Sequence, residues 1–279
     1  MVFATLVATQ ALQQQLGSWR IFDCRHDLAR PELGERRYRE GHIPGALFAH
    51  LDRDLSAPKD GTNGRHPLPE RGAFIAWLGR QGLKASDRVV CYDAGNAMMA
   101  ARLWWMLRWA GHEAAAVLDG GFARWQAEGR PESAEVPSFP HTRYPMRQPL
   151  NEAVAVGDVQ ANLEKLLLVD ARSAARFRGE QEPIDPVAGH IPGAKNRYAA
   201  DNVQADGRFK DAASLRAEFE TVLGGRRPQD LVNYCGSGVA AAHNALALQI
   251  AGLPGSRLYA GSWSEWISDP KRPRATGGE

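Results

Sequence analysis

The segment Gly41-His42-Ile43-Pro44-Gly45-Ala46 recurs, identical in all six positions, at residues 189–194 of this 279-residue chain. An apolar run that ends in aspartate and then arginine precedes each copy, as RIFDCR at 20–25 and as LLVDAR at 167–172. Chance does not produce a match of this length in the same local order. The two segments therefore indicate that the chain is an internal repeat of one structural unit.

The order of elements around the repeat predicts an α/β fold. A second apolar run in each half leads straight into a helical stretch: 87–93 before 97–110, and 230–235 before 239–251. A third pair of matching segments, 118–125 and 259–266, has the pattern of a short strand, a glycine turn and a helix start. Short apolar strands that alternate with helices form mostly parallel sheets. We expect two tandem domains, each a mostly parallel sheet flanked by helices.

The expected domains are residues 1–130 and 150–279, joined by residues 131–149 as an extended linker. The linker holds four prolines within residues 131–145 and shows no helical period. In the alignment of the two halves, Asp93 occupies the place of Cys235. A duplicated fold that differs at this position predicts an inactive first domain and a working site in the second.

Composition and charge exclude several classes of protein. About 44% of the residues are apolar and 24% are charged, which is ordinary for a soluble globular protein. A formal charge of +2 creates no global field that would hold nucleic acid or an anionic membrane. The chain shows neither an export signal nor an apolar run of about 18 residues. We expect a cytoplasmic protein that binds neither nucleic acid nor a membrane.

The three cysteines differ in their surroundings. Cys24 and Cys91 lie in strand-like apolar runs, where a small buried thiol is the expected role. Three dispersed cysteines without a CxxC pair predict neither a disulfide framework nor a zinc site, and they fit a reducing compartment. Cys235 instead stands between an apolar strand and an alanine-rich helix, in the loop Cys-Gly-Ser-Gly.

The loop around Cys235 predicts an anion-binding turn. Gly236 and Gly238 let several N–H groups point inward, and the helix start adds partial positive charge, so we expect the thiolate to be stabilised for nucleophilic chemistry. A phosphatase would need an arginine six residues after the cysteine, where this chain has Ala241. A cysteine hydrolase would need an imidazole beside the sulfur. Sulfur transfer is the favoured chemistry, while a buried structural thiol is the plain alternative.

With these segments the chain resembles the tandem-domain rhodanese and 3-mercaptopyruvate sulfurtransferase family. The resemblance covers nearly the whole sequence: both Gly-His-Ile-Pro-Gly-Ala segments, the Asp-x-Arg strand ends, YDA at 92–94, RLWWMLR at 102–108, LDGG at 118–121, RFRG at 176–179 and the cysteine loop. It implies two rhodanese-like domains with an inactive first copy. It implies no metal and no organic cofactor.

The resemblance also implies roles for individual residues. Cys235 would carry the transferred sulfur as a persulfide. In the mercaptopyruvate branch a loop serine joins a histidine and an aspartate in handling a proton, and the matching positions are Ser237, His66 and Asp52. Without the resemblance, His66 would be a loop residue with a hydrogen-bonded ring and Asp52 a turn cap. A proton must reach carbon when the donor's C–S bond breaks, which this trio would help to supply.

The implied donor site has a basic side and a backbone side. Arg176 matches an arginine that binds the donor carboxylate in relatives, although a solvated surface arginine is the alternative; Arg178 is a weaker candidate. Gly236, Gly238 and Val239 complete the site. His42 and His190 recur in both halves, so we expect both to be structural.

The sequence departs from the family pattern in one informative place. Many mercaptopyruvate enzymes have a second carboxylate-binding arginine after a Glu-Pro pair, whereas Glu182-Pro183 is followed here by Ile184. The loop Cys-Gly-Ser-Gly-Val resembles that of the mercaptopyruvate enzymes, whereas thiosulfate enzymes tend to carry basic residues after the cysteine. The resemblance therefore implies 3-mercaptopyruvate as the favoured donor, and thiosulfate stays the alternative. The expected acceptor is cyanide, a small thiol or a thioredoxin-like dithiol. The alternative of another class is a non-catalytic sulfur-binding or regulatory protein of this fold.

Overall fold

The computed structural model describes residues 5–278, which form two compact units. The first unit contains the chain up to Ala57, then Pro69–Leu150 and Val203–Phe209. The second contains Pro58–Leu68, Asn151–Asn202 and the chain from Lys210 onward. Each unit therefore includes a short segment from the sequence range predicted for the other domain.

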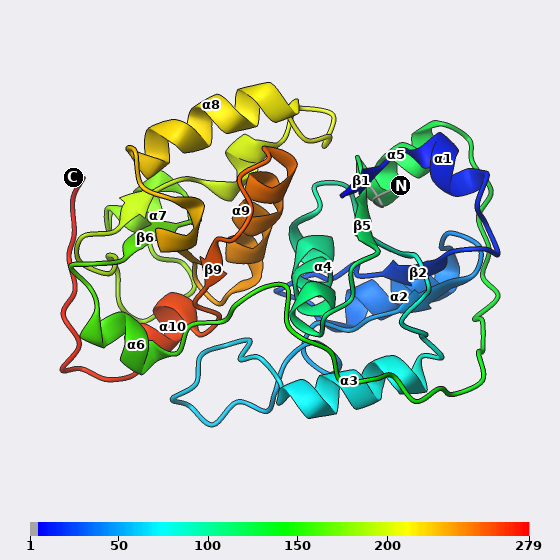
Figure 1. The fold of residues 1–279 in the computed structure, drawn as a ribbon, viewed down its shortest axis with the longest axis horizontal. Helices are drawn as coiled ribbons and strands as arrows, with labels where there is room; N and C mark the ends of the chain where they lie inside the picture. The colour runs from blue at the N-terminus through cyan, green and yellow to red at the C-terminus, as the bar shows by residue number, and fades with distance from the viewer. Residues whose placement is uncertain (1–4, 279) are drawn as a thin grey trace. The chain divides into compact units, whose positions relative to one another are not determined.

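The first unit is built on a parallel sheet with the strand order β1-β5-β4-β2-β3. Figure 1 labels β1, β2 and β5 of this sheet. Its strands are β1 (Leu6–Val7), β2 (Arg20–Asp23), β3 (Ala46–Phe48), β4 (Val89–Tyr92) and β5 (Ala115–Leu118). Its helices are α1 (Thr9–Gln13), α2 (Glu32–Glu40), α3 (Arg71–Arg80), α4 (Met98–Trp109) and α5 (Gly121–Ala127). The central strands are fully buried, as expected for a parallel sheet covered by helices.

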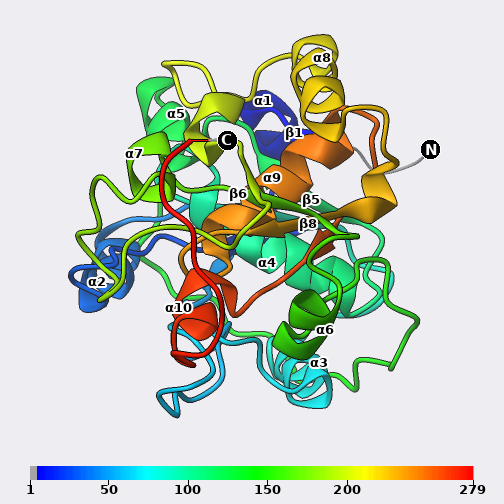
Figure 2. The same cartoon turned by 90° about the vertical axis from the view of Figure 1, so that its left-hand side faces the viewer.

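The second unit repeats this plan with the parallel order β7-β6-β8-β9. Its strands are β6 (Leu167–Asp170), β7 (Lys195–Asn196), β8 (Leu231–Tyr234) and β9 (Arg257–Leu258). Its helices are α6 (Val156–Ala161), α7 (Ala174–Phe177), α8 (Ala212–Leu223), α9 (Val239–Ile250) and α10 (Ser262–Trp266), with short 3-10 turns at Ala199–Asn202 and Pro228–Asp230. Helix α9 packs on β8 and β9, and Figure 2 shows it next to β8. The predicted α/β class and the predicted parallel sheets are confirmed.

The repeated Gly-His-Ile-Pro segment is tied to the sheet in the same way in both units. Arg25 pairs with Asp23 and donates to the carbonyl of Gly41 at 2.6 Å. In the second unit Arg172 pairs with Asp170 and donates to the carbonyl of Gly189 at 2.7 Å. A buried ion pair whose arginine also donates to the glycine carbonyl explains why the Asp-x-Arg strand ends and the first glycine recur together.

The histidines of the repeat have matching structural contacts. The Nδ1 atoms of His42 and His190 each lie 2.7 Å from a backbone carbonyl, that of Tyr38 and that of Phe177 respectively. Both histidine rings are buried. The ring of His42 stacks on Tyr38, and the ring of His190 stacks on Phe177. These contacts agree with the structural role that the sequence predicts for both.

Residues 131–149 form no helix or strand and pack along the first unit. A Cβ atom at Gly79 would lie 2.5 Å from the carbonyl oxygen of Thr142, and one at Gly82 would lie 2.8 Å from that of Pro140. The segment lies against the first unit, where Gly79 and Gly82 leave room for its backbone. Within residues 5–278, none of the helices is both long and apolar enough to cross a membrane.

Candidate functional site

The loop from Cys235 to Gly238 joins the end of β8 to the start of α9. Gly238 adopts the left-handed conformation, with φ of +81°, and a Cβ atom there would lie 2.3 Å from the carbonyl oxygen of Ala260. Any other residue would collide with the backbone and strain the turn. The glycine pattern therefore shapes a tight turn directly in front of a 12-residue helix.

The sulfur of Cys235 faces backbone donors of this turn. Its Sγ accepts N–H groups from Ser237 at 3.4 Å and from Gly238 at 3.1 Å. Cys235 is 2% exposed, so bulk water does little to solvate the sulfur. Backbone donors at a helix N-terminus stabilise a negative charge, which is what a nucleophilic thiolate requires.

The first unit contains the same loop with a carboxylate in place of the sulfur. Asp93 accepts N–H groups from Gly95 and Ala97, each at 3.0 Å, and from Met99 and Ala100 at 2.8 and 3.2 Å. Burial raises the pKa of Asp93, and the four backbone donors act in the opposite direction. The loop geometry is thus that of an anion cradle in both units.

Ser237 is joined to His66 by a buried hydrogen bond. The Oγ atom lies 2.8 Å from Nδ1 of His66. His66 belongs to the segment Pro58–Leu68, which packs in the second unit. The same segment is fastened to α10, where the N–H of Arg65 donates to Oγ of Ser264 at 3.0 Å. This packing brings together the predicted serine and histidine, which are 171 positions apart.

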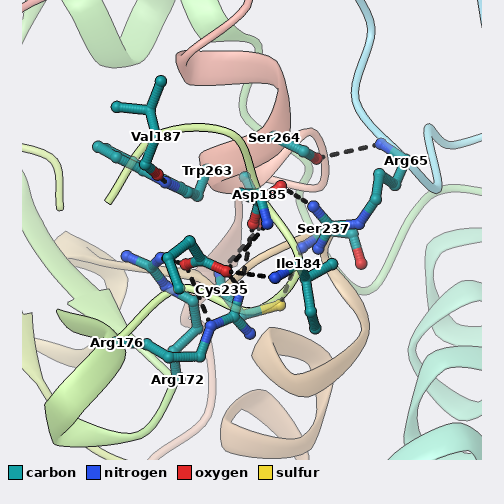
Figure 3. Close-up of polar contacts among 12 residues, drawn as sticks. Arg65, Arg172, Arg176, Ile184, Asp185, Val187, Cys235, Ser237, Trp263 and Ser264 are labelled. Atoms are coloured by element: carbon teal, nitrogen blue, oxygen red, sulfur yellow. Dashed lines mark hydrogen bonds and ion pairs between the residues drawn. The ribbon is translucent and has the colours of Figure 1, made fainter. Parts of the chain in front are cut away.

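Two guanidinium groups, those of Arg65 and Arg176, lie beside Gly236. Figure 3 shows both arginines in the surroundings of Cys235. A Cβ atom at Gly236 would lie 2.7 Å from Nη2 of Arg65 and 3.5 Å from Nη2 of Arg176. The absence of a side chain at Gly236 therefore leaves room for both groups next to Cys235. Arg65 is a site residue that the sequence analysis missed, although it directly precedes His66.

Carboxylates hold these arginines in position. Arg176 donates to Glu182 at 2.7 Å and to Asp185 at 3.1 Å, and Arg65 forms an ion pair with the other oxygen of Asp185. Glu182 also accepts from Arg172 at 3.2 Å. Within residues 5–278, these hydrogen bonds leave Nε and Nη2 of Arg65 and Nη1 of Arg176 without a protein partner. Those atoms are the ones available to an anionic ligand.

The charges of the cluster are in balance before any ligand binds. It contains three guanidinium groups and three carboxylates: Arg65, Arg172, Arg176, Asp170, Glu182 and Asp185. Burial lowers the pKa of Arg65, the negative charge of a Cys235 thiolate raises it, and Arg176 lowers it again. An anion that enters beside Gly236 therefore meets directed N–H donors of partly buried cations.

Asp52 lies in the first unit, next to two histidines. Its Oδ2 is 3.7 Å from Nε2 of His26, and its N–H donates to Nδ1 of His50 at 3.1 Å. The side chains of His26, His50 and Asp52 present ligand-type atoms within 4.8 Å of one another, the single such group in the described part of the chain. Nδ1 of His50 accepts backbone N–H groups, which assigns the ring proton to Nε2 and disfavours a metal there. The role of Asp52 in the trio with Ser237 and His66 stays a prediction.

Two other predicted residues have different surroundings. Val239 is buried at the first position of α9, directly after the loop. Arg178 is paired with the exposed Glu180 at 2.6 Å. It lines a cavity of about 520 Å³ together with Phe177, Lys195 and Asn196, and no residue of the cysteine loop lines that cavity. Of the two predicted arginines, Arg176 is the one that the structure joins to the loop.

Arg65, Glu182 and Asp185 complete the site, and local sequence signals for them are weak. The Glu-Pro pair at 182–183 points to a turn, and the structure shows Glu182 accepting the N–H groups of Ile184 and Asp185 at 3.1 and 3.0 Å. Arg65 and Asp185 are 120 positions apart, so their pairing leaves no local pattern.

Comparison with known proteins agrees with this architecture. The family model of the rhodanese-like domain matches residues 8–128 and 155–269. A Pseudomonas aeruginosa protein named "Probable 3-mercaptopyruvate sulfurtransferase" is 47% identical over 98% of this chain and 99% of its own length. The thiosulfate sulfurtransferase of Mus musculus is 33% identical over 95% of this chain and 93% of its own length. A solved 3-mercaptopyruvate sulfurtransferase from Leishmania major has a TM-score of 0.86 and 31% identity, covering 96% of this chain and 75% of that one. The chain belongs to the rhodanese family and carries two rhodanese-like domains in tandem.

Proposed function

We propose that this protein is a sulfurtransferase in which Cys235 takes a sulfur atom from 3-mercaptopyruvate and passes it to a thiophilic acceptor. The observation that carries the proposal is the position of the Cys235 sulfur, which faces backbone N–H donors beside two guanidinium groups. This combination suits a thiolate nucleophile and an anionic donor. The relatives named above support the same reaction class.

In the first step the thiolate of Cys235 attacks the sulfur of the donor. The donor's C–S bond breaks, its electron pair goes to carbon as an enolate, and a proton delivered to that carbon gives pyruvate. Cys235 keeps the sulfur as a persulfide. In the second step an acceptor such as cyanide or a thiol attacks the outer sulfur, and the Cys235 thiolate leaves.

Ser237 and His66 are the proposed proton-handling pair. Their hydrogen bond of 2.8 Å lies in a buried region, next to the sulfur where the enolate forms. A hydroxyl polarised by an imidazole is a suitable general acid for carbon. Asp52 is kept in the proposal as the acidic member of the trio, on the strength of the family pattern.

Arg176 and Arg65 are the proposed anion-binding groups for the donor carboxylate. Arg65 would take the place of the second carboxylate-binding arginine that is absent at Ile184, because its guanidinium lies beside Gly236. Gly236, Gly238 and Val239 supply the backbone side of the site. Arg178 is the weakest member, since its ion pair with Glu180 lies on an exposed part of the chain.

Thiosulfate is the second candidate donor, because two arginines beside Cys235 also suit a dianion. Assays of pyruvate release from 3-mercaptopyruvate and of thiocyanate from thiosulfate and cyanide decide between the donors. We expect activity with both and a higher kcat/KM for 3-mercaptopyruvate, and none in Cys235→Ser. A reduced, folded protein that turned over neither donor would contradict the proposal and favour a non-catalytic sulfur-binding or regulatory role.

The donor-binding role of the arginines has its own test. Arg65→Gln removes one charged donor and should raise KM for 3-mercaptopyruvate at least about tenfold, with a smaller effect on kcat. Arg227→Gln is the matched control, because Arg227 is an exposed arginine of the same unit, paired with Asp230 at 3.0 Å. An unchanged KM in Arg65→Gln would remove Arg65 from the donor site.

The acceptor and the compartment complete the proposal. A small thiol or a thioredoxin-like dithiol would resolve the persulfide, since either supplies a thiolate that attacks sulfur. A cytoplasmic location fits the three free cysteines, which a reducing compartment would keep as thiols. No metal or organic cofactor enters the reaction as written.

A further inference from the structure

Ser262 has a backbone conformation that a residue with a side chain rarely adopts. Its φ is +56°, in the left-handed region, and it is fully buried at the start of α10. Among residues 5–278, Ala97 is the one other non-glycine residue with positive φ. Such a conformation persists where the surroundings compensate for it, and it often marks a functional site.

The repeat shows which residue would fill this position without strain. Gly121 has the same φ of +56° in the first unit. The hydrogen bonds around the two positions correspond: Trp263 donates to the carbonyl of Cys235 at 2.9 Å, and Phe122 donates to that of Asp93 at 2.8 Å. The unit whose loop carries Asp93 thus has glycine at this position, and the unit whose loop carries Cys235 has serine.

The hydroxyl of Ser262 ties the catalytic strand end to the turn before α10. Its Oγ accepts the backbone N–H of Cys235 at 3.1 Å and donates to the carbonyl of Tyr259 at 2.9 Å. Both contacts are buried, so water does not replace them at low cost. A glycine at this position would provide neither contact.

The side chain of Ser262 also occupies space that the first unit does not have. A Cβ atom at Gly121 would lie 2.8 Å from the carbonyl oxygen of Asp93 and 2.8 Å from Cα of Gly95. The preceding glycine differs as well, with φ of +81° at Gly120 and −62° at Gly261. The turn in the second unit is therefore built to admit a side chain against its cysteine loop.

We propose that Ser262 is a positioning residue for Cys235. Its hydroxyl holds the backbone N–H of Cys235, and this anchor directs Sγ toward the N–H groups of Ser237 and Gly238. The unfavourable φ is retained because the hydroxyl is needed. The proposal rests on the proposed function in taking Cys235 as the nucleophile, and it adds a residue that acts through the cysteine without touching the donor.

The test uses Ser262→Gly and Ser262→Ala in the full-length protein. Ser262→Gly relieves the backbone strain and removes the hydroxyl, whereas Ser262→Ala keeps the strain and removes the hydroxyl. Ser256→Ala is the control, because Ser256 is also buried and its Oγ accepts from Asn233 of β8 at 3.2 Å, a contact that does not involve Cys235. The readout is the rate at which iodoacetamide alkylates Cys235 as a function of pH, followed by mass spectrometry of the Cys235 peptide.

We expect both Ser262 variants to react about tenfold more slowly at neutral pH, with the midpoint of the pH dependence moved upward. Ser256→Ala should keep the wild-type profile even if its melting temperature falls. A wild-type profile in Ser262→Gly would overturn the inference. Alkylation needs no sulfur donor, so this outcome is separate from that of the proposed function: a wild type that transfers no sulfur would contradict the latter alone.

Discussion

Asp93 and Cys235 occupy matching positions in the two units, and in both the backbone N–H groups of the loop donate to the side chain. The carboxylate of Asp93 collects four backbone N–H groups, and the sulfur of Cys235 collects two. The donors come from the backbone, so they persist whichever side chain stands there. The chemistry of each unit is therefore set by the residue in the loop and by its neighbours, above all Ser237, His66 and Arg176.

At the same scale, Ser237→Ala should separate the two donors. The variant loses the hydroxyl that lies 2.8 Å from Nδ1 of His66. Turnover of 3-mercaptopyruvate should fall by roughly 10²-fold, because that donor needs a proton at carbon, and turnover of thiosulfate should change far less. Pyruvate and thiocyanate assays on the same preparation measure both rates. Equal losses with the two donors would mean that Ser237 has no proton-handling role.

At the scale of elements, the site depends on strand ends that turn sharply into helices. β8 is an inner strand that ends at Tyr234, so Cys235 lies at its carboxyl end, and Gly238 makes the turn in front of α9. The positive φ of Gly238 and the nearby carbonyl of Ala260 leave no room for a side chain. The conformation of the loop therefore also fixes the direction of the N–H groups that face the sulfur of Cys235.

Gly238→Ala should destabilise the loop more than the φ penalty alone explains. The new Cβ would meet the carbonyl oxygen of Ala260 at 2.3 Å. Gly193→Ala is the matched control, because Gly193 has φ of +75° and open space around the added atom. We expect a loss of about 1 to 2 kcal/mol in the free energy of unfolding for Gly193→Ala, and a clearly larger one for Gly238→Ala. Urea unfolding of the two variants measures the difference, and similar losses would contradict this account of the loop.

At the scale of the whole molecule, the repeat made most of the fold predictable. The strand ends Asp23-Cys24-Arg25 and Asp170-Ala171-Arg172 mark equivalent strands because buried Asp–Arg pairs require both residues. The helices predicted at 97–110 and 239–251 match α4 and α9 to within a residue at each end. These features depend on local pattern, which a sequence displays directly.

The exchange of segments between the two units was not predictable in the same way. Residues 58–68 pack in the second unit and residues 203–209 pack in the first. Neither segment forms a helix or an extended strand, and their positions depend on contacts such as Arg65 with Asp185 and Phe209 with Asp119. For that reason the sequence indicated His66 through the family pattern but left Arg65 unnoticed.

Stability of the molecule should depend on pH through His112. Burial lowers the pKa of His112 to about 4, and its Nδ1 lies 2.7 Å from the hydroxyl of Tyr144. The neutral ring is therefore favoured in the folded state, and its contribution is complete above the unfolded pKa of about 6.5. It is lost as the pH falls from there toward 4, by up to roughly 3 kcal/mol.

The measurement compares urea unfolding of the wild type and His112→Gln at pH 7.5 and pH 5. We expect the wild type to lose more free energy of unfolding than the variant over this interval. Buried carboxyl groups with a raised pKa, such as Asp93, act in the opposite direction, and the comparison with the variant isolates the histidine. The same pH dependence in both proteins would contradict this role of His112.

Whether Cys235 carries the transferred sulfur can be read from the mass of the intact protein. Reduced wild type and Cys235→Ser are treated with 3-mercaptopyruvate, freed of excess donor and weighed by mass spectrometry before and after addition of cyanide. We expect the wild type to gain one sulfur atom that cyanide removes, and Cys235→Ser to gain none, although Cys24 and Cys91 are still present. A wild type that gains no sulfur, or a Cys235→Ser variant that gains as much, would contradict this expectation.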